Sequence, residues 1–307
     1  MADRTALSAV AEVLRDAGLL TRPEDFSTVT VTGVTQDSRA VFPGALFLAW
    51  RGTAADAHDF VLDAEEAGAS AAVVERAVEE VSIPQLVVSD GRSAAALVSD
   101  FLAGSPWRGL FVGGVTGTNG KTTTALLTRA LLARLGSSAA VGTLGLVGPD
   151  GGVRPGTEAL TTPGPVQVSR WLRDLADEGV SHVVMEASSH ALEQRRLDGV
   201  RFDVVVFTNL THDHLDYHAD LDAYRDAKGH LVDLLKPDGL LVLNADDPAW
   251  NVLPSAAPRT VRFGRAEAAD LRIGEERHRA SGSSFTLTWK GATAGVDLPL
   301  PGAFNVE

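Results

Sequence analysis

Residues Gly114–Thr124 carry the strongest chemical signal in the sequence, because they combine three glycines with a lysine and a run of threonines. An apolar run precedes them and an Ala/Leu-rich run follows, which predicts a loop between a strand and a helix. Backbone N–H groups of such a loop, together with the helix dipole, can surround a phosphate. Lys121 would reach the β- and γ-phosphates, and the Thr122 hydroxyl would bind Mg²⁺. The residues predicted to contact a nucleotide are Gly117, Thr118, Asn119, Gly120, Lys121, Thr122 and Thr123.

The spacing of this loop departs from the generic phosphate-loop pattern, since Val115 stands where the first glycine would be. A plain glycine turn with a solvated lysine is the alternative interpretation. The Gly-Lys-Thr order between a strand and a helix favours phosphate binding. Nucleotide binding alone leaves kinases, GTPases and motor ATPases open.

A second polar run, Met185–Leu197, follows another apolar strand. Glu186 ends that strand, where a carboxylate has little structural reason to be and can face a ligand. The alternative is that Glu186 and Ser188 cap the helix that follows.

Histidines gather in a third run, Thr208–His218, which also follows an apolar strand. The order His212-x-His214-x-Asp216 is similar to metallo-hydrolases, but Tyr217 replaces the histidine that follows the aspartate there, and those enzymes have no phosphate loop. Oxygen-rich surroundings beside a nucleotide favour Mg²⁺ over zinc.

The elements that must position these runs alternate between short β-branched stretches and Ala/Leu-rich stretches, which predicts an α/β fold. Gly104, Ser105 and Pro106 indicate a boundary. We therefore predict an N-terminal α/β domain at 1–105 and a central domain at 106–307, with a doubly wound, mainly parallel sheet. Alternating residues near Phe285 predict an antiparallel appendage between 266 and 300.

Composition excludes several classes of protein. The 307 residues carry a net charge of −13, which argues against nucleic-acid binding, and no cysteine, which excludes disulfides and thiolate zinc sites. Charges interrupt the apolar residues of the N-terminus, and no uncharged stretch approaches about 20 apolar residues. We expect a soluble, cytoplasmic protein without membrane insertion.

Six motifs, in order along the chain, resemble the Mur ligases, and the phosphate loop also resembles that of the related folylpolyglutamate synthetases. The six are residues 35–49 with Asp37-Ser38-Arg39, the phosphate loop, the loop at 161–163, and the runs at 185–197, 208–218 and 244–248. Within the family they look most like the enzymes that add the third residue of the peptidoglycan peptide. Ala57 and Gly164 depart from the family pattern, as does the unusual segment Trp50–Gly52.

The resemblance implies an ATP-dependent ligase that joins an amino acid, diaminopimelate or lysine, to UDP-MurNAc-L-Ala-D-Glu through an acyl phosphate. It implies catalytic roles for Lys121, Glu186, His214 and Lys228, and two Mg²⁺ ions held by Thr122, Glu186, His214 and Lys228. Lys228, by itself an ordinary solvated helix lysine, would carry a CO₂-derived carbamate. The implied substrate contacts are Ser38, Thr53, Ala54, Ala55, Thr161, Thr162, Ser188, Gln194 and Arg196.

The ending Pro301-Gly-Ala-Phe-Asn-Val-Glu307 resembles the start of the family's C-terminal, Rossmann-like domain, so we expect that domain to be absent from this chain. We expect a monomer. The alternatives are another Mur ligase, a folylpolyglutamate synthetase, or a fragment that binds the substrates without ligating them.

Overall fold

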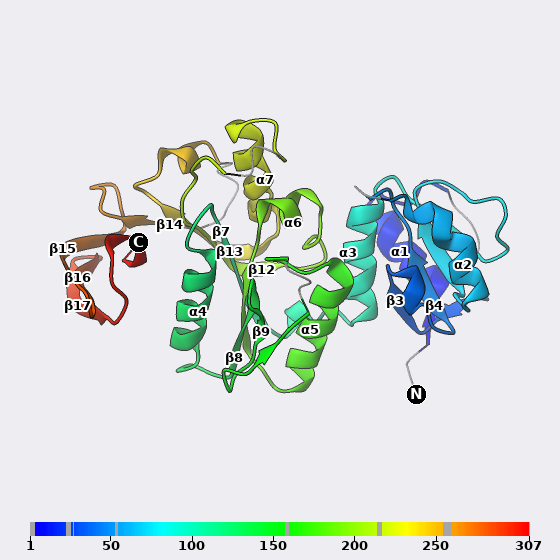
Figure 1. Cartoon of the computed structure of the whole chain (residues 1–307), viewed down its shortest axis with the longest axis horizontal. Coiled ribbons are helices and arrows are strands. Elements are labelled where there is room, and N and C mark those ends of the chain that lie inside the picture. The colour runs from blue at the N-terminus through cyan, green and yellow to red at the C-terminus, as the bar shows by residue number, and fades with distance from the viewer. Residues whose placement is uncertain are drawn as a thin grey trace. The chain divides into compact units, whose positions relative to one another are not determined.

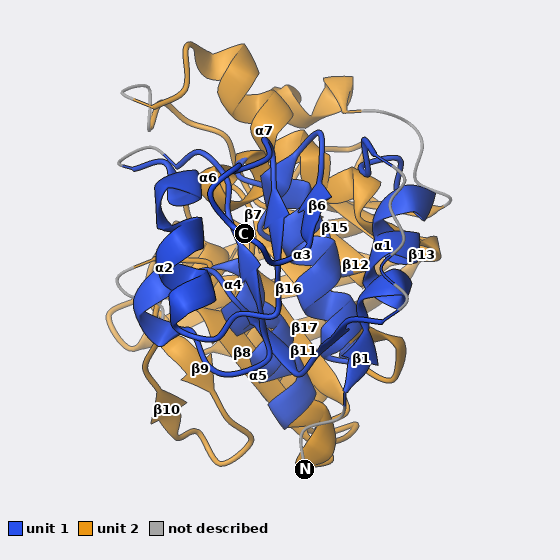
Figure 2. Cartoon of the chain, turned by 90° about the vertical axis from the view of Figure 1, so that its right-hand side faces the viewer, with its two compact units in different colours: residues 1–106, 164–174, 194–200 blue, residues 107–163, 175–193, 201–307 orange. Residues whose placement is uncertain are grey.

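The computed structural model describes residues 4–22, 26, 28–52, 55–156, 160–213, 217–253 and 259–306. The chain forms two compact units (Figure 2). Unit 1 comprises residues 1–106, 164–174 and 194–200, and unit 2 comprises the remainder. Two short segments of the later chain thus cluster with the first unit. A simple domain division after residue 105 stays a prediction.

Unit 1 is built on a parallel sheet with the order β3-β4-β5-β6. Its strands are β3 (Gly33–Thr35), β4 (Ala45–Leu48), β5 (Ala71–Val74) and β6 (Gln85–Val87), beside the pair β1 (Thr5–Ala6) and β2 (Thr30–Val31). Its helices are α1 (Leu7–Asp16), α2 (Val61–Glu66) and α3 (Gly91–Leu102), and α5 (Pro165–Asp177) begins in it.

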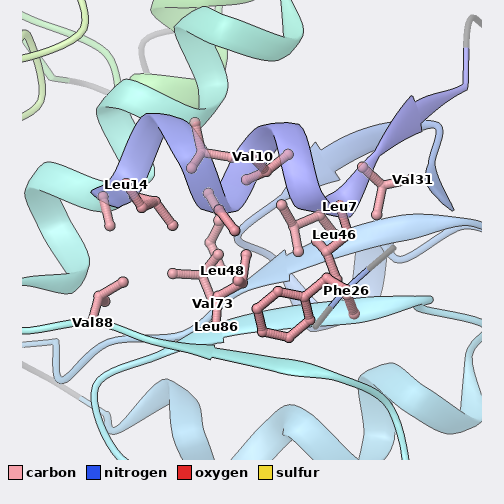
Figure 3. Close-up of a cluster of buried hydrophobic side chains, with 14 of the residues drawn as sticks. Leu7, Val10, Leu14, Phe26, Val31, Leu46, Leu48, Val73, Leu86 and Val88 are labelled. Atoms are coloured by element: carbon pink, nitrogen blue, oxygen red, sulfur yellow. The ribbon is translucent and has the colours of Figure 1, made fainter. Parts of the chain in front are cut away.

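The side chains of successive residues of β4 point to opposite faces of this sheet, as the pleat of a strand requires. Leu46 and Leu48 join the core beneath α1 and α3 (Figure 3), whereas Phe47 packs with Val61 of α2 on the other face. The all-apolar β4 therefore fits a parallel strand that is covered on both faces.

Unit 2 contains an 11-stranded sheet among the described residues, in the order β10-β9-β8-β11-β7-β12-β13-β14-β15-β16-β17 (Figure 1). The strands are β7 (Phe111–Thr116), β8 (Ser138–Gly142), β9 (Gly145–Val147), β10 (Val153–Arg154), β11 (His182–Glu186), β12 (Phe202–Phe207), β13 (Leu235–Asn244), β14 (Arg259–Gly264), β15 (Leu271–Arg279), β16 (Gly282–Trp289) and β17 (Ala292–Leu298). The helices are α4 (Lys121–Leu132), α6 (Ser189–Glu193) and α7 (Leu221–Asp233).

Strands β8, β11, β7, β12, β13, β14 and β15 run parallel. Val115 of β7 packs with Ala125 of α4, while the neighbouring Gly114 faces Phe202 of β12 and Leu231 of α7. Helices therefore cover both faces of the sheet, and the predicted doubly wound α/β fold is confirmed.

The far end of this sheet is antiparallel, as the alternation near Phe285 predicts. Strands β15, β16 and β17 pair as a meander, and Ile273, Phe285 and Val306 form its small core. Within the described part of the chain, no helix is both long and apolar enough to cross a membrane.

Candidate nucleotide-binding site

The loop between β7 and α4 needs two of its glycines for distinct reasons. Gly117 has φ of +143° and lies so close to the Thr208 hydroxyl that a Cβ would collide with it. Gly120 has φ of +87° and is the N-cap of α4, a left-handed conformation in which glycine carries no steric penalty. The helix begins at Lys121, so its free N–H groups and its positive dipole end face the loop.

The loop is fastened to the carboxyl end of the neighbouring strand β12. Thr118 donates its N–H to the Asn209 carbonyl at 2.7 Å, and Asn119 donates its N–H to the Asn209 side chain at 2.9 Å. The Thr208 hydroxyl donates to the Asn119 carbonyl at 2.7 Å. The third polar run therefore supports the phosphate loop directly.

Two lysines meet at one carbonyl of this loop. Lys121 Nζ donates to the carbonyls of Gly117 at 3.0 Å and Thr118 at 2.9 Å, and Lys228 Nζ donates to the same Gly117 oxygen at 2.8 Å. Lys228 also lies 4.2 Å from the ring centre of Tyr224, whose hydroxyl contacts the Thr118 hydroxyl at 3.3 Å.

Burial lowers the pKa of both amines. It holds the pKa of Lys121 below its usual value, although the charges of Glu186 and Asp213 oppose the shift. Lys228 is only 1% exposed, and burial followed by the nearby charge of Lys121 places its pKa well below 10.5. Lys228 is thus far readier to be neutral than an ordinary helix lysine, and a neutral amine is a nucleophile and a hydrogen-bond donor rather than a cation.

Glu186 is 3% exposed, and hydroxyl and amide groups surround its carboxylate. Thr122 donates its hydroxyl to Oε2 at 2.9 Å. Thr143, in the turn between β8 and β9, donates its N–H to Oε1 at 2.9 Å and its hydroxyl to Oε2 at 3.1 Å. The Glu186 carboxylate is therefore hydrogen-bonded to the first turn of the helix after the phosphate loop, through Thr122, rather than capping α6.

Thr122 and Glu186 also line a narrow recess beside α4. The remaining lining is made by glycines and apolar side chains of α4, β8 and β9. Because the Glu186 side chain is buried, the electrostatic interactions of its carboxylate are stronger than they would be in water.

Thr162 and Ser188 contact the backbone at and just after Glu186. The Thr162 side chain is fully buried; its hydroxyl donates to the Glu186 carbonyl at 2.8 Å and accepts the N–H of Ser188 at 3.1 Å. Ser188 accepts the N–H of Ala191 at 3.2 Å and so caps α6, as the structural alternative anticipated. In this structure both hydroxyls support the β11–α6 corner, and substrate contact by them stays a prediction.

A histidine clamp holds α6 against the segment that precedes α7. The buried His218 lies 3.0 Å from the Ser189 hydroxyl through Nε2 and 3.1 Å from the Glu193 carboxylate through Nδ1. The order Ser–His–Glu is similar to a hydrolase triad, but the contacts show only that His218 joins two residues of α6, Ser189 and Glu193.

Of the other predicted substrate residues, some make the local contacts given next and the rest lie outside the described residues. In unit 1, Ser38 starts a 3₁₀ turn that Asp37 caps, and Ala55 accepts the N–H of Gly52 at 2.9 Å. Gln194 accepts the Arg196 guanidinium at 2.7 Å, also in unit 1. Thr161, in unit 2, contacts the Thr143 hydroxyl at 3.4 Å. Thr53, Ala54 and His214 lie outside the described residues.

The structure thus brings Lys121, Thr122, Glu186 and Lys228 together around one loop. Among the described residues, no group of three or more His, Cys, Asp or Glu side chains could hold a metal. The Glu186 carboxylate and the Thr122 hydroxyl are nevertheless hard oxygen donors, the type that Mg²⁺ prefers. These donors fit a magnesium ion bound jointly with phosphates.

Sequence reasoning missed Thr143 and Tyr224 and did not give Thr208 its role in the loop. Thr143 lies between Gly142 and Gly145, a pattern that indicates only a turn. Tyr224 precedes Lys228 by four residues on α7, so the i,i+4 rule could have paired them.

Fold and site together define a doubly wound α/β protein with a phosphate loop at the switch point of its sheet. The model of the Mur ligase middle domain matches residues 115–307, and that of the Mur ligase family catalytic domain matches residues 30–98. The chain belongs to the Mur ligase family.

Two curated relatives are named UDP-N-acetylmuramoyl-L-alanyl-D-glutamate–2,6-diaminopimelate ligase. The protein of Geobacter sulfurreducens is 40% identical over 98% of this chain and 59% of its own length. That of Geobacter metallireducens is 42% identical over 90% of this chain and 55% of its own length. The chain therefore spans less than two thirds of these relatives.

Solved structures show the same fold. A 2,6-diaminopimelate ligase of the same name superposes with a TM-score of 0.80 at 28% identity, over 94% of this chain and 59% of that one. MurF from Acinetobacter baumannii gives 0.67 at 23% identity, over 99% of this chain and 62% of its own, and supports the fold alone.

Proposed function

We propose that this chain supplies the nucleotide- and UDP-substrate-binding parts of an ATP-dependent ligase of peptidoglycan precursors. The reaction would join 2,6-diaminopimelate to the D-glutamyl carboxylate of UDP-MurNAc-L-Ala-D-Glu, in keeping with the names of its relatives. The observation that carries the proposal is the bond from Thr122 to Glu186, because it joins the second motif to the phosphate loop.

A carboxylate resists attack by an amine, so the reaction needs activation. An oxygen of the D-glutamyl carboxylate attacks the γ-phosphorus of ATP, and the bond to the ADP oxygen breaks. The amine of diaminopimelate then attacks the acyl carbon, phosphate leaves, and the amine loses a proton. Lys121 would leave the loop carbonyls and turn its charge toward the transferring phosphoryl group, a contribution on the order of several kcal/mol in such sites.

We propose Thr122, Glu186, His214 and Lys228 as the residues that hold two Mg²⁺ ions. Bound Mg²⁺ neutralises phosphate charge. The Thr122 hydroxyl can donate to Glu186 and still offer a lone pair to a cation, so its two roles are compatible.

The carbamate on Lys228 follows from the chemistry of its amine. Only a neutral amine adds CO₂, and burial of Lys228 lowers its pKa in the required direction. Labelled ¹³C-bicarbonate should give a carbamate carbon resonance that the Lys228→Met variant lacks. A spectrum without that difference would refute the carbamate while leaving ATP binding intact.

The test of the main proposal is calorimetric titration of ATP into the chain with and without Mg²⁺. We expect metal-dependent binding that Lys121→Ala abolishes and that the matched control Lys290→Ala retains, since Lys290 lies in the distant β16–β17 turn beside Trp289. Equal binding by Lys121→Ala would refute the assigned loop. A product assay with the UDP-dipeptide, run in parallel, separates binding from ligation.

A further inference from the structure

Thr143 is the feature of this site that neither the motifs nor the proposed function uses. We infer that Thr143 is a positioning residue, which aims the Glu186 carboxylate at a divalent cation bound with the nucleotide. The inference rests on the proposed function, because it concerns the metal that ATP would bring. Thr143 acts through Glu186 and touches neither phosphate nor metal itself.

The turn that carries Thr143 is shaped to fit Glu186. A Cβ at Gly142 would overlap the terminal atoms of the Glu186 side chain, so the absence of a side chain lets the carboxylate lie over the turn. At the other end, Gly145 has φ of +99°, and a Cβ there would meet the carbonyl of Arg154. Two glycines therefore fix the position of Thr143 relative to the carboxylate.

Thr143 donates hydrogen bonds to both oxygens of the Glu186 carboxylate, from its N–H to Oε1 and from its hydroxyl to Oε2. With the hydroxyl of Thr122, three donors from the described residues occupy three of the roughly four lone-pair sites of a carboxylate. One lone-pair site remains among these contacts. Rotation of the carboxylate would break at least one of these hydrogen bonds, so they fix the orientation of the carboxylate.

The hydroxyl of Thr143 also connects Glu186 to the loop at 161–163. A hydroxyl has a single proton, and the charged Glu186 oxygen at 3.1 Å is a better acceptor than the Thr161 hydroxyl at 3.4 Å. The Thr143 hydroxyl therefore lies between the Thr161 hydroxyl and the carboxylate.

A merely structural role would not require this hydroxyl. Thr143 is exposed, so water could satisfy its hydroxyl, and valine has the same shape and keeps the backbone N–H. The hydroxyl instead contacts a buried carboxylate that has few other partners among the described residues. Partners of this kind, one step away from a metal ligand, typically matter by 10–100-fold in metal affinity.

The experiment measures how much Mg²⁺ the chain needs to bind ADP, by calorimetry, for the unmodified chain and the variants Thr143→Val and Thr143→Ser. We expect Thr143→Val to need roughly 10–100-fold more Mg²⁺, and Thr143→Ser, which keeps the hydroxyl, to behave like the unmodified chain. The matched control is Thr293→Val, which removes an exposed hydroxyl on β17 that lies 3.0 Å from Thr288. Paramagnetic resonance of bound Mn²⁺ gives a second readout without turnover.

Thermal unfolding of each variant shows whether a change reflects folding. A Thr143→Val chain with unchanged melting and an unchanged Mg²⁺ requirement would overturn the positioning role while ADP binding itself persists. Loss of affinity in the serine variant equal to that in the valine variant would also overturn it. Absence of metal-dependent ADP binding in the unmodified chain would overturn the proposed function instead, and Thr143's role with it.

Discussion

Replacing Lys228 with methionine tests the buried amine without any ligand. Lys228 is 1% exposed, and its pKa lies well below 10.5 because burial and the charge of Lys121 disfavour the ammonium. In the unfolded chain the same amine is solvated and takes up a proton below about 10.5. Between the two pKa values the unfolded state binds more protons, so the stability of the native chain rises with pH by up to about 1.4 kcal/mol per pH unit.

The size of the effect follows from the contacts that methionine removes. The bond from Lys228 to the Gly117 carbonyl is lost, at a cost of about 1 kcal/mol. That oxygen keeps a donor, because Lys121 Nζ lies 3.0 Å from it. The Lys228→Met variant should therefore be slightly less stable than the unmodified chain near the upper end of this range. As the pH falls, the free energy of unfolding of the variant should increase relative to that of the unmodified chain, until the pH reaches the native pKa of Lys228.

Urea unfolding across this pH range, in CO₂-free buffer, measures the difference. Lys290→Met is the matched control for the loss of a lysine, since Lys290 is exposed in a turn. Parallel stability curves for the Lys228→Met variant and the unmodified chain would show that Lys228 is charged in the native state, and the argument from burial would be wrong.

Two further changes test the packing around the carboxylate and the histidine clamp. Gly142→Ala should displace Glu186 and so weaken Mg²⁺-dependent nucleotide binding by roughly 10–100-fold. It should cost only about 1–3 kcal/mol of stability, because the flexible Glu186 side chain can move aside. Near-normal affinity would mean that the position of the carboxylate is not critical. His218→Phe should cost about 1–3 kcal/mol in urea unfolding, since it leaves the buried Ser189 hydroxyl without this partner. Adding Ser189→Ala should recover part of that loss, and strictly additive costs would contradict the pairing.

Much of the fold could be predicted because local signals and tertiary structure agree. Strand β5 occupies the apolar run at 71–74, and α5 begins at Pro165, where a proline is favoured at the first helical position. The start of strand β13 is harder to predict, because residues 236–239 have the composition of a turn. The strand begins at Leu235 because Leu235 pairs with Phe202, a tertiary contact that the local sequence does not reveal.

The site was predictable only where a residue type is unusual for its place. Glu186 at the end of an apolar strand and Lys121 after a glycine loop are unusual, and the structure brings both to one place. Thr143 is an ordinary turn residue, and its partner is 43 residues away in the sequence. Thr162 is the opposite case. Its motif predicts a ligand contact, but its hydroxyl is buried and donates to the backbone carbonyl of Glu186.

The convergence of these residues is a consequence of parallel pairing. In the sheet, Glu186 pairs with Val115, and Phe207 pairs with Thr116, so β11, β7 and β12 end at the same level. A residue just beyond each end must then lie beside the phosphate loop, whatever its distance in sequence. An antiparallel β11 would carry Glu186 to the opposite edge, away from Thr122. The register of β11 against β7 therefore determines whether the chain can place a carboxylate beside the loop, and the two hydrogen bonds from Thr143 orient that carboxylate.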